Sequence, residues 1–330
     1  MISRVADSCF WFGRYVERAE STARHMRATL HLAIDGELSP RQAWHPALIV
    51  AGEEGPFTAR HGDEAVADGE AVQRHLVWDD QCIVSLIRSV SAARENARAI
   101  RDVLSSDVWE YVNELHLWLH TEAAEAQYRT QRDGFYRHVR QLTQLILGLL
   151  RSTMLHDMAL DFIWLGVMLE RANQTARLLD VHHHAFAEME EKPGPAQGIV
   201  ETAVWLALLR ALSGVEPFMK THPGRVTGEA VARFLVSDGR FPRSISYCVH
   251  AAHDRFKYLR PEEDEGLPGG ESLARFAQLD RWVQSLGADG RDPTKAPGGL
   301  HAILTAVVNE TATIAETIGR ELLGYGGAEQ

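Results

Sequence analysis

Apolar residues recur every three or four positions along most of the 330-residue chain, and this spacing places side chains on one face of an α-helix. No segment shows the alternation of apolar and polar residues that is typical of a half-buried β-strand. The pattern predicts helices at 3–34, 39–51, 82–104, 107–127, 133–156, 159–187, 197–212, 227–236, 243–259, 270–286 and 299–323. Segments rich in Gly, Pro and acidic residues separate them at 52–69, 190–198, 261–270 and 287–299. We therefore expect an all-α helical bundle with one long acidic loop in its first half.

The first predicted helix has three distinct faces on a helical wheel. Its apolar face consists of Phe12, Val16, Ala19, Ala23, Met26 and Leu30. A second face carries Trp11, Tyr15, Arg18 and Thr22, and a third carries Gly13, Glu17, Glu20 and Arg24. Because each face carries residues suited to packing or pairing, we expect this helix to be surrounded by protein.

The chain repeats part of its own sequence. The tract Trp11–Arg24 recurs as Trp164–Arg177, with eight of fourteen residues identical. Residues 69–93 match residues 228–252 without gaps at twelve of twenty-five positions. A repeat of this length indicates a duplicated domain or half-domain rather than a solenoid. We expect a first helical repeat at 1–155 and a second at 156–330, related by a pseudo-twofold axis and forming one compact unit.

The repeated tracts carry a Glu-Arg pair in each copy. Contacts across a twofold axis are reciprocal, so we expect Glu17 to pair with Arg171 and Arg18 to pair with Glu170. Arginine suits such pairs because its guanidinium is always charged and can grip a carboxylate through two hydrogen bonds. On one interpretation these pairs are a structural clasp that holds the two copies together.

The other interpretation is a polar ligand pocket between the copies. The candidate substrate-binding residues are Glu17, Arg18, Glu20, Arg24, Glu170, Arg171, Asn173 and Arg177. The arginines would receive an anion, while Glu17 and Glu170 would bind an amine or act as general bases. The copies differ where Glu20 is replaced by Asn173, an asymmetry that an asymmetric ligand could use. The sequence leaves both interpretations open.

Charge and composition exclude several classes of partner. The chain has 34 basic and 45 acidic residues, a formal net charge of −11, so it repels nucleic acid and anionic membrane surfaces. Its first residues lack the apolar core of a signal peptide, and no uncharged apolar run is long enough to span a bilayer. These features predict a soluble, cytoplasmic protein without nucleic-acid or membrane partners.

No motif for a metal or a cofactor is evident. Di-iron helical bundles use Glu-x-x-His motifs, and none of the sixteen histidines has Glu three residues before it. The three cysteines are widely spaced and are interpreted as small buried side chains. The sequence also lacks a Gly-rich phosphate loop. Two arginines at a turn, Arg240 and Arg243, are interpreted as part of a helix cap and a solvated face.

The motifs together resemble a known family. The tracts FWFGRYVERAESTAR and IWLGVMLERANQTAR, together with SVSAARENAR, a Trp109-Glu110-x-x-Asn113 pattern and DGRFPRSI, are similar to those of the alpha-E domain family, an all-helical bacterial family named for its Glu-Arg motif. The resemblance places the family's signature positions at Glu17, Arg18, Glu170 and Arg171. It implies an association with circularly permuted ATP-grasp proteins and with transglutaminase-like proteins, and therefore a role in making or processing amide bonds.

Three functions remain open at this stage. The first is an accessory or substrate-binding subunit of an ATP-grasp amide ligase that binds a peptide or amino-acid substrate between the repeats. Such a chain needs no cofactor of its own, since it lacks an ATP site. The second is an enzyme that transfers an acyl or amide group with Glu17 or Glu170 as general base. The third is a non-catalytic scaffold.

Overall fold

The structure is a computed structural model that describes residues 2–35, 38–190, 197–261, 266–288, 292–295 and 298–325, without the side chains of 184–190, 197 and 199. The expected breaks at 190–198, 261–270 and 287–299 lie partly outside these residues. The described residues form helices and turns and contain no strand. The all-α prediction is therefore confirmed.

Helices of very different lengths make up the two halves of the chain. The first half forms α1 (Ser3–Asp35), α2 (Pro40–Ala51), α3 (Glu54–His61), the 3-10 helix η1 (Asp63–Ala67), α4 (Gly69–Trp78), α5 (Leu86–Ala99), α6 (Ser106–Leu119), α7 (Glu122–Thr130) and α8 (Arg132–Thr153). The second half forms α9 (Met158–Glu190), α10 (Gln197–Ala211), α11 (Val215–Thr221), α12 (Gly228–Ser237), α13 (Ile245–Leu259), α14 (Gly270–Gly287), η3 (Pro293–Lys295), α15 (Gly299–Ile318) and η4 (Gly319–Leu323).

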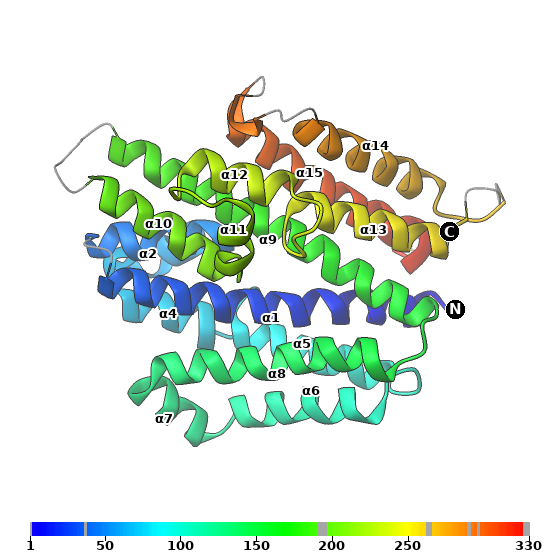
Figure 1. Cartoon of the computed structure of the whole chain (residues 1–330). Helices are drawn as coiled ribbons and strands as arrows, with labels where there is room; N and C mark the ends of the chain where they lie inside the picture. Colours follow the sequence, from blue (N-terminus) through cyan, green and yellow to red (C-terminus); the bar gives the residue numbers. More distant parts are fainter. Residues whose placement is uncertain are drawn as a thin grey trace.

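The long helices α1 and α9 pack against each other at the centre of the molecule (Figure 1). A Cβ atom at Gly13 of α1 would lie 2.0 Å from the carbonyl oxygen of Ile163. A Cβ atom at Gly166 of α9 would lie 2.1 Å from the carbonyl oxygen of Phe10. Glycine is therefore required at both positions, because any side chain would push the two backbones apart.

The remaining helices cover this central pair. Helices α5 and α8 pack on α1, while α13 and α15 pack on α9. The halves also exchange contacts, since α10 packs against α1 and α2 packs against α9. The expectation that the first helix is surrounded by protein is confirmed.

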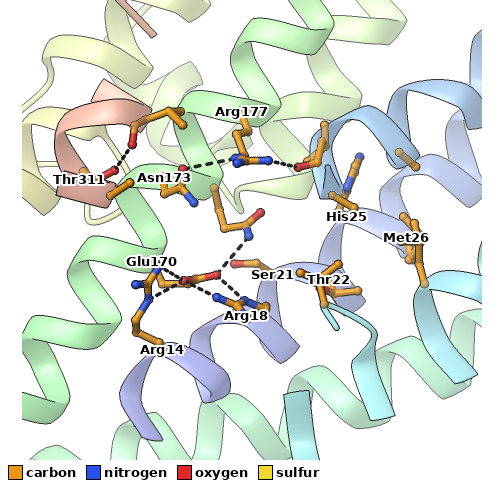
Figure 2. Close-up of a pocket in the computed structure, with 18 residues that line it drawn as sticks. Arg14, Arg18, Ser21, Thr22, His25, Met26, Glu170, Asn173, Arg177 and Thr311 are labelled. Atoms are coloured by element: carbon orange, nitrogen blue, oxygen red, sulfur yellow. Dashed lines mark hydrogen bonds and ion pairs between the residues drawn. The ribbon is translucent and has the colours of Figure 1, made fainter. Parts of the chain in front are cut away.

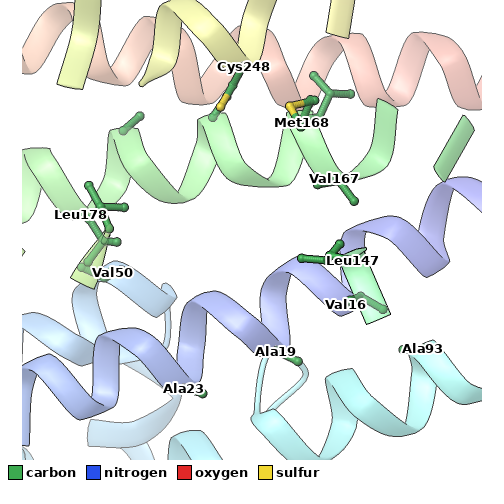
Figure 3. Close-up of a cluster of buried hydrophobic side chains, with 14 of the residues drawn as sticks. Val16, Ala19, Ala23, Val50, Ala93, Leu147, Val167, Met168, Leu178 and Cys248 are labelled. Carbon is green, nitrogen blue, oxygen red and sulfur yellow. The ribbon is translucent and has the colours of Figure 1, made fainter. Parts of the chain in front are cut away.

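Buried side chains fill the space between the helices. Val16, Ala19 and Ala23 of α1 and Val167 and Met168 of α9 belong to one cluster that also includes side chains of α2, α5, α8 and α13 (Figure 3). The small residues on α1 allow its neighbours to approach closely. All three cysteines, Cys9, Cys82 and Cys248, are buried, as expected.

Serine and threonine caps define several helix starts. Ser39 accepts a hydrogen bond from the backbone of Gln42 and receives the reciprocal contact of a capping box, with Pro40 at the first helical position. Ser85 and Ser244, which stand at equivalent positions of the two matching segments, both cap their helices in the same way. Local sequence therefore determines these helix boundaries.

The predicted long acidic loop at 52–69 is wrong, because this segment forms α3 and η1. Gly52 ends α2 with a positive φ of 74°, and Pro56 lies in the first turn of α3, where proline is tolerated. The fully buried Phe57 anchors this short helix in the core.

Three other helical segments differ from the prediction. The helix expected at 107–127 is two helices, α6 and α7, because Thr121 caps a new helix through the backbone of Ala124. The sequence pattern also missed α4 and the short α11. No helix within the described residues has the length and apolar character needed to cross a membrane.

Candidate functional site: a cationic pocket beside buried Glu-Arg pairs

Both expected Glu-Arg pairs form between α1 and α9. Arg171 donates to Glu17 through Nε at 3.0 Å and through Nη2 at 2.7 Å. Arg18 donates to Glu170 through Nε at 2.7 Å and through Nη2 at 3.0 Å. Each pair is thus reciprocal and bidentate, which is the strongest geometry for a guanidinium and a carboxylate.

The Glu17 pair is part of a closed ionic network. Arg243 donates to Glu17 at 2.6 Å and to Glu20 at 2.8 Å, and Arg24 forms an ion pair with Glu20. Both carboxylates are fully buried. Two carboxylates and three guanidiniums therefore meet in one buried ionic network, in which Arg24 Nε has no hydrogen-bond partner among the described residues.

The electrostatics of Glu17 follow from these neighbours. Burial raises the pKa of its carboxyl, but the charges of Arg171 and Arg243 and their hydrogen bonds outweigh burial and lower the pKa from 4.5 to about 2. Glu17 is consequently ionised at neutral pH, and its oxygens are already occupied by donors.

The Glu170 pair is arranged differently. Besides Arg18, its carboxylate accepts a hydrogen bond from Arg14 Nε at 2.9 Å and one from Gln174 Nε2 at 3.3 Å. Burial raises the pKa of Glu170, but the charges of Arg18 and Arg14 outweigh burial and lower it well below its ordinary value. The carboxylate is 1% exposed, whereas Arg14 and Arg18 are 14% exposed. Their guanidiniums therefore reach the edge of an open space.

This space is a cavity of about 280 Å³ between the two central helices and their neighbours. Its lining residues are Arg14, Arg18, Ser21, Thr22, His25, Met26, Ala47, Val50, Ala51, Leu76, Val84, Glu170, Asn173, Gln174, Arg177, Val308, Thr311 and Ala312. Figure 2 shows Glu170 held between Arg14 and Arg18, with Arg177 beside Asn173 at a separate place on the wall. The cavity lies at the small end of ligand sites, which span roughly 300 to 1,000 Å³.

Arg177 has weak partners. Its Nε donates to Asn173 Oδ1 at 3.4 Å, and its Nη1 donates to the carbonyl oxygen of Val50, also at 3.4 Å. Among the described residues, no carboxylate forms an ion pair with it. The lining of the cavity thus carries three guanidiniums and a single carboxylate, so the cavity has an excess of positive charge.

The difference between Glu20 and Asn173 has a structural origin. The match between residues 69–93 and 228–252 places Val84 at the position of Arg243. Beside Glu17, the charge of Arg243 is neutralised by Glu20. At the matching place beside Glu170, the uncharged residues Val84 and Asn173 replace Arg243 and Glu20. Glu20 therefore takes part in the buried network, whereas the uncharged Asn173 offers Arg177 no counter-ion from the matching position.

His25 is the remaining titratable group on the cavity wall. Burial and the neighbouring His182 lower the pKa of His25 from 6.5 to about 3. The imidazole is consequently neutral at physiological pH. Arginine side chains alone supply the positive charge of the cavity at that pH.

Comparison with known proteins assigns the chain to a family. The model of the Alpha-E family, described as a predicted alpha-helical domain with a conserved ER motif, matches residues 1–323. The chain belongs to the Alpha-E family. The resemblance seen in the sequence is thereby confirmed.

The Alpha-E chain is also similar to longer mycobacterial proteins. An uncharacterized protein of Mycobacterium bovis is 27% identical over 327 residues, which cover 93% of this chain and 36% of that protein. An uncharacterized protein of Mycobacterium tuberculosis is 26% identical over the same length, again with 36% of the relative covered. The chain thus spans just over a third of the relatives it matches. No solved structure matches it significantly.

The structure divides the predicted site residues of the Alpha-E chain into two groups. Arg18, Glu170, Asn173 and Arg177 line the cavity. The other four, Glu17, Glu20, Arg24 and Arg171, lie in the buried ionic network. The clasp and the pocket are therefore neighbouring parts of one arrangement.

Two important arginines were not recognised from the sequence. Arg243 was expected on a solvated face, but it is 9% exposed and binds Glu17 and Glu20; that part of the prediction is wrong. Its partner in the motif, Arg240, does lie at the surface and pairs with Asp238. Arg14 was passed over because Val167 replaces it in the second tract. Its position one turn before Arg18 was the available signal.

Proposed function

We propose that this Alpha-E chain binds a small ligand with a carboxylate group, an amino acid or a short peptide, in the cavity beside Glu170. The observation that carries the proposal is Arg177, a guanidinium on the cavity wall whose only partners within the described part of the chain are an amide and a carbonyl. A ligand carboxylate would give it the charged partner it lacks. The apolar wall of Met26, Leu76 and Val308 would accept an aliphatic part of the ligand.

The proposed role is that of an accessory or substrate-binding subunit of an ATP-grasp amide ligase. The partner class comes from the family resemblance, which also suggests a transglutaminase-like partner. The mycobacterial relatives extend well beyond the matched segment, so a fused partner is compatible with their length. An ATP-dependent partner would place the chain in the cytoplasm, and the net charge of −11 makes nucleic acid and anionic membranes unfavourable partners.

Binding is favoured over general-base catalysis by the state of the carboxylates. A useful general base at neutral pH has a pKa near the working pH and a free lone pair. The pKa of Glu17 is about 2, and Glu170 accepts hydrogen bonds from Arg14, Arg18 and Gln174. Both groups are better suited to orienting guanidiniums than to accepting a proton from a substrate.

We further infer that residues 1–155 and 156–330 are tandem repeats related by a pseudo-twofold axis. Support comes from reciprocal contacts, since Gly13 meets Ile163 and Gly166 meets Phe10. Each half also contains an equivalent internal contact between a glycine and a tryptophan. Gly69 lies against Trp44 in the first half, and Gly228 lies against Trp205 in the second. On this view the residues around Glu17 form a structural network, while the equivalent residues around Glu170 form a ligand site.

The scaffold alternative rests on the buried network alone. Glu17, Arg171 and Arg243 would hold the two halves together whether or not the cavity binds a ligand. That alternative gives no role to Arg177, however, which lines the cavity and takes no part in the network.

Reconstituted ligation tests the proposed role. The chain is combined with an ATP-grasp protein of the class that the family resemblance implies, and ATP-dependent formation of the ligated product is measured with and without the chain. We expect product formation to require the chain and Arg177→Met to lower the rate about tenfold or more, as loss of a charged hydrogen bond would. Arg240→Met, which removes an exposed surface arginine, is the matched control and should leave the rate unchanged.

Two outcomes would contradict the proposal. Ligation by the ATP-grasp protein alone, unaffected by the chain, excludes an accessory role. Loss of activity in a folded Glu170→Gln variant that still binds substrate with unchanged affinity favours the enzymatic alternative instead.

A further inference from the structure

A second group of polar side chains is buried in the first half of the chain, apart from the Glu-Arg network. Glu53 lies between α2 and α3, His75 lies on α4, and Cys82 lies in the turn after α4. They are only 6%, 3% and 1% exposed, respectively. A carboxylate oxygen, an imidazole nitrogen and the thiol sulfur all lie within 4.8 Å of one another.

We propose that Glu53, His75 and Cys82 bind a divalent transition-metal ion, with Zn²⁺ as the best match. Thiolate, imidazole and carboxylate together are a typical zinc ligand set. Tetrahedral bonds of the usual lengths place ligand atoms about 3.3 to 3.8 Å apart. His75 Nε2 and Glu53 Oε2 are already 3.1 Å apart, so small side-chain adjustments create the site.

A further carboxylate orients the central ligand. Asp79, which caps the C-terminus of α4, lies 2.9 Å from His75 Nδ1. This contact fixes the imidazole with Nε2 directed at Glu53. Histidines that bind metals commonly make this second contact to a carboxylate, which sets the tautomer and makes the ligand more basic.

The second half of the chain provides an internal comparison. The matching segments place Phe234 opposite His75 and Phe241 opposite Cys82. These two rings stack with centroids 4.6 Å apart. Gly214 directly precedes α11, just as Glu53 directly precedes α3. A Cβ atom at Gly214 would lie 3.2 Å from the ring of Phe241.

The polar trio is Glu53, His75 and Cys82, and the matching apolar trio is Gly214, Phe234 and Phe241. The surroundings of the two trios are otherwise alike. Phe57 and His61 of α3 are in ring contact at 4.7 Å, and Phe218 and His222 of the corresponding segment are in ring contact at 4.8 Å. The fold therefore packs well at this place with glycine and two phenylalanines. Since burying a carboxylate, an imidazole and a thiol costs more than burying apolar groups, the polar trio points to a ligand that uses it.

The three ligands leave room in the coordination sphere. A tetrahedral ion with three protein ligands holds a water molecule or a ligand group in its fourth position. The Cys82 thiol would release its proton to solvent as the sulfur binds the metal. Ala51, Leu76 and Val84, each within two residues of a proposed ligand, line the cavity described above, so metal binding would order part of that wall.

Metal titration of the full chain tests this inference. Protein stripped with a chelator is titrated with Zn²⁺ alone, and bound metal is measured by atomic emission. In parallel, Co²⁺ is added to a second sample of the stripped protein and its ultraviolet and visible absorption spectrum is recorded. We expect one ion per chain, a higher melting temperature with Zn²⁺, and a near-ultraviolet thiolate-to-cobalt charge-transfer band.

Four variants separate a metal site from a structural polar cluster. Cys82→Ser should lose the cobalt band, whereas Cys248→Ser, at another buried cysteine, should keep both the band and the stoichiometry. Asp79→Asn should keep the band but weaken affinity about 10- to 100-fold. The triple variant Glu53→Gly, His75→Phe and Cys82→Phe copies the other half and should remain helical by circular dichroism without binding metal.

The inference is overturned if the wild-type chain binds no stoichiometric Zn²⁺ or Co²⁺. That result would make His75 a simple link between the carboxylates of Glu53 and Asp79. Unchanged affinity in Cys82→Ser, or loss of binding in Cys248→Ser, would also overturn it. If the triple variant does not fold, Cys82→Ser and Cys248→Ser still decide the question.

Discussion

Replacing Glu17 by glutamine tests whether the buried network holds the two halves together. The change removes the charge that Arg171 and Arg243 share while keeping the size of the side chain. Removing one partner of a buried ion pair costs about 3 to 5 kcal/mol. A second estimate agrees, since lowering the pKa of Glu17 from 4.5 to about 2 corresponds to about 3 kcal/mol of stability at neutral pH.

Urea unfolding at pH 7, followed by circular dichroism, measures this effect. With a denaturant slope of about 3 kcal/mol per molar, the midpoint of Glu17→Gln should fall by roughly 1 M or more. Glu95→Gln is the control, because Glu95 is 52% exposed and pairs with Arg94 and Arg98 at the surface. Surface pairs contribute only about 0 to 1 kcal/mol.

The pH dependence gives an independent check. The folded-state pKa of Glu17 is lowered, so its stabilisation is complete above the unfolded-state pKa near 4.5 and is lost as the pH falls toward 2. The difference between wild type and Glu17→Gln should therefore shrink on acidification. A variant as stable as wild type at pH 7, or a difference that stays constant below pH 4.5, would refute the reasoning.

Three further predictions follow from the close helix crossing and from the cavity. Gly166→Ala should lower the free energy of unfolding by about 1 to 3 kcal/mol or more, because the new Cβ atom would meet the Phe10 carbonyl oxygen; Gly148→Ala, with nothing within 4 Å, should be neutral or slightly stabilising in the same denaturation assay. Asn173→Glu supplies the carboxylate that Arg177 lacks, and calorimetry should show at least about a tenfold loss of affinity for a carboxylate ligand in a folded variant. Because the pKa of His25 is about 3, that affinity should not change between about pH 8 and pH 6; a steep change across this interval would require a different titrating group in the cavity.

The helical bundle was predictable because its signals are local. Three-and-four spacing marked α1, α8 and α9. The Glu17–Arg171 and Arg18–Glu170 pairs followed from the repeated tract together with the reciprocity of twofold contacts. Short helices such as α3 were missed, because a segment rich in Gly and Pro hides a single buried anchor, Phe57.

The details of the site depend on contacts between distant residues, which periodicity does not reveal. Arg243 reaches Glu17 across 226 positions of sequence, and a turn rich in arginine looks the same whether it faces solvent or a buried carboxylate. The sequence also predicted no metal site, because Glu53 and His75 are 22 residues apart and Cys82 lies in the turn after α4. Only the fold brings these three side chains together.

The central claim is that the cavity beside Glu170 binds a carboxylate through Arg177. Isothermal titration calorimetry tests it most directly, with the affinity of each free amino acid or dipeptide compared with that of its C-terminal amide. We predict that wild type and Arg240→Met bind at least one free carboxylate about tenfold or more tightly than its amide, and that Arg177→Met loses this preference. Equal binding of acid and amide by wild type, or an unchanged preference in Arg177→Met, would contradict the claim.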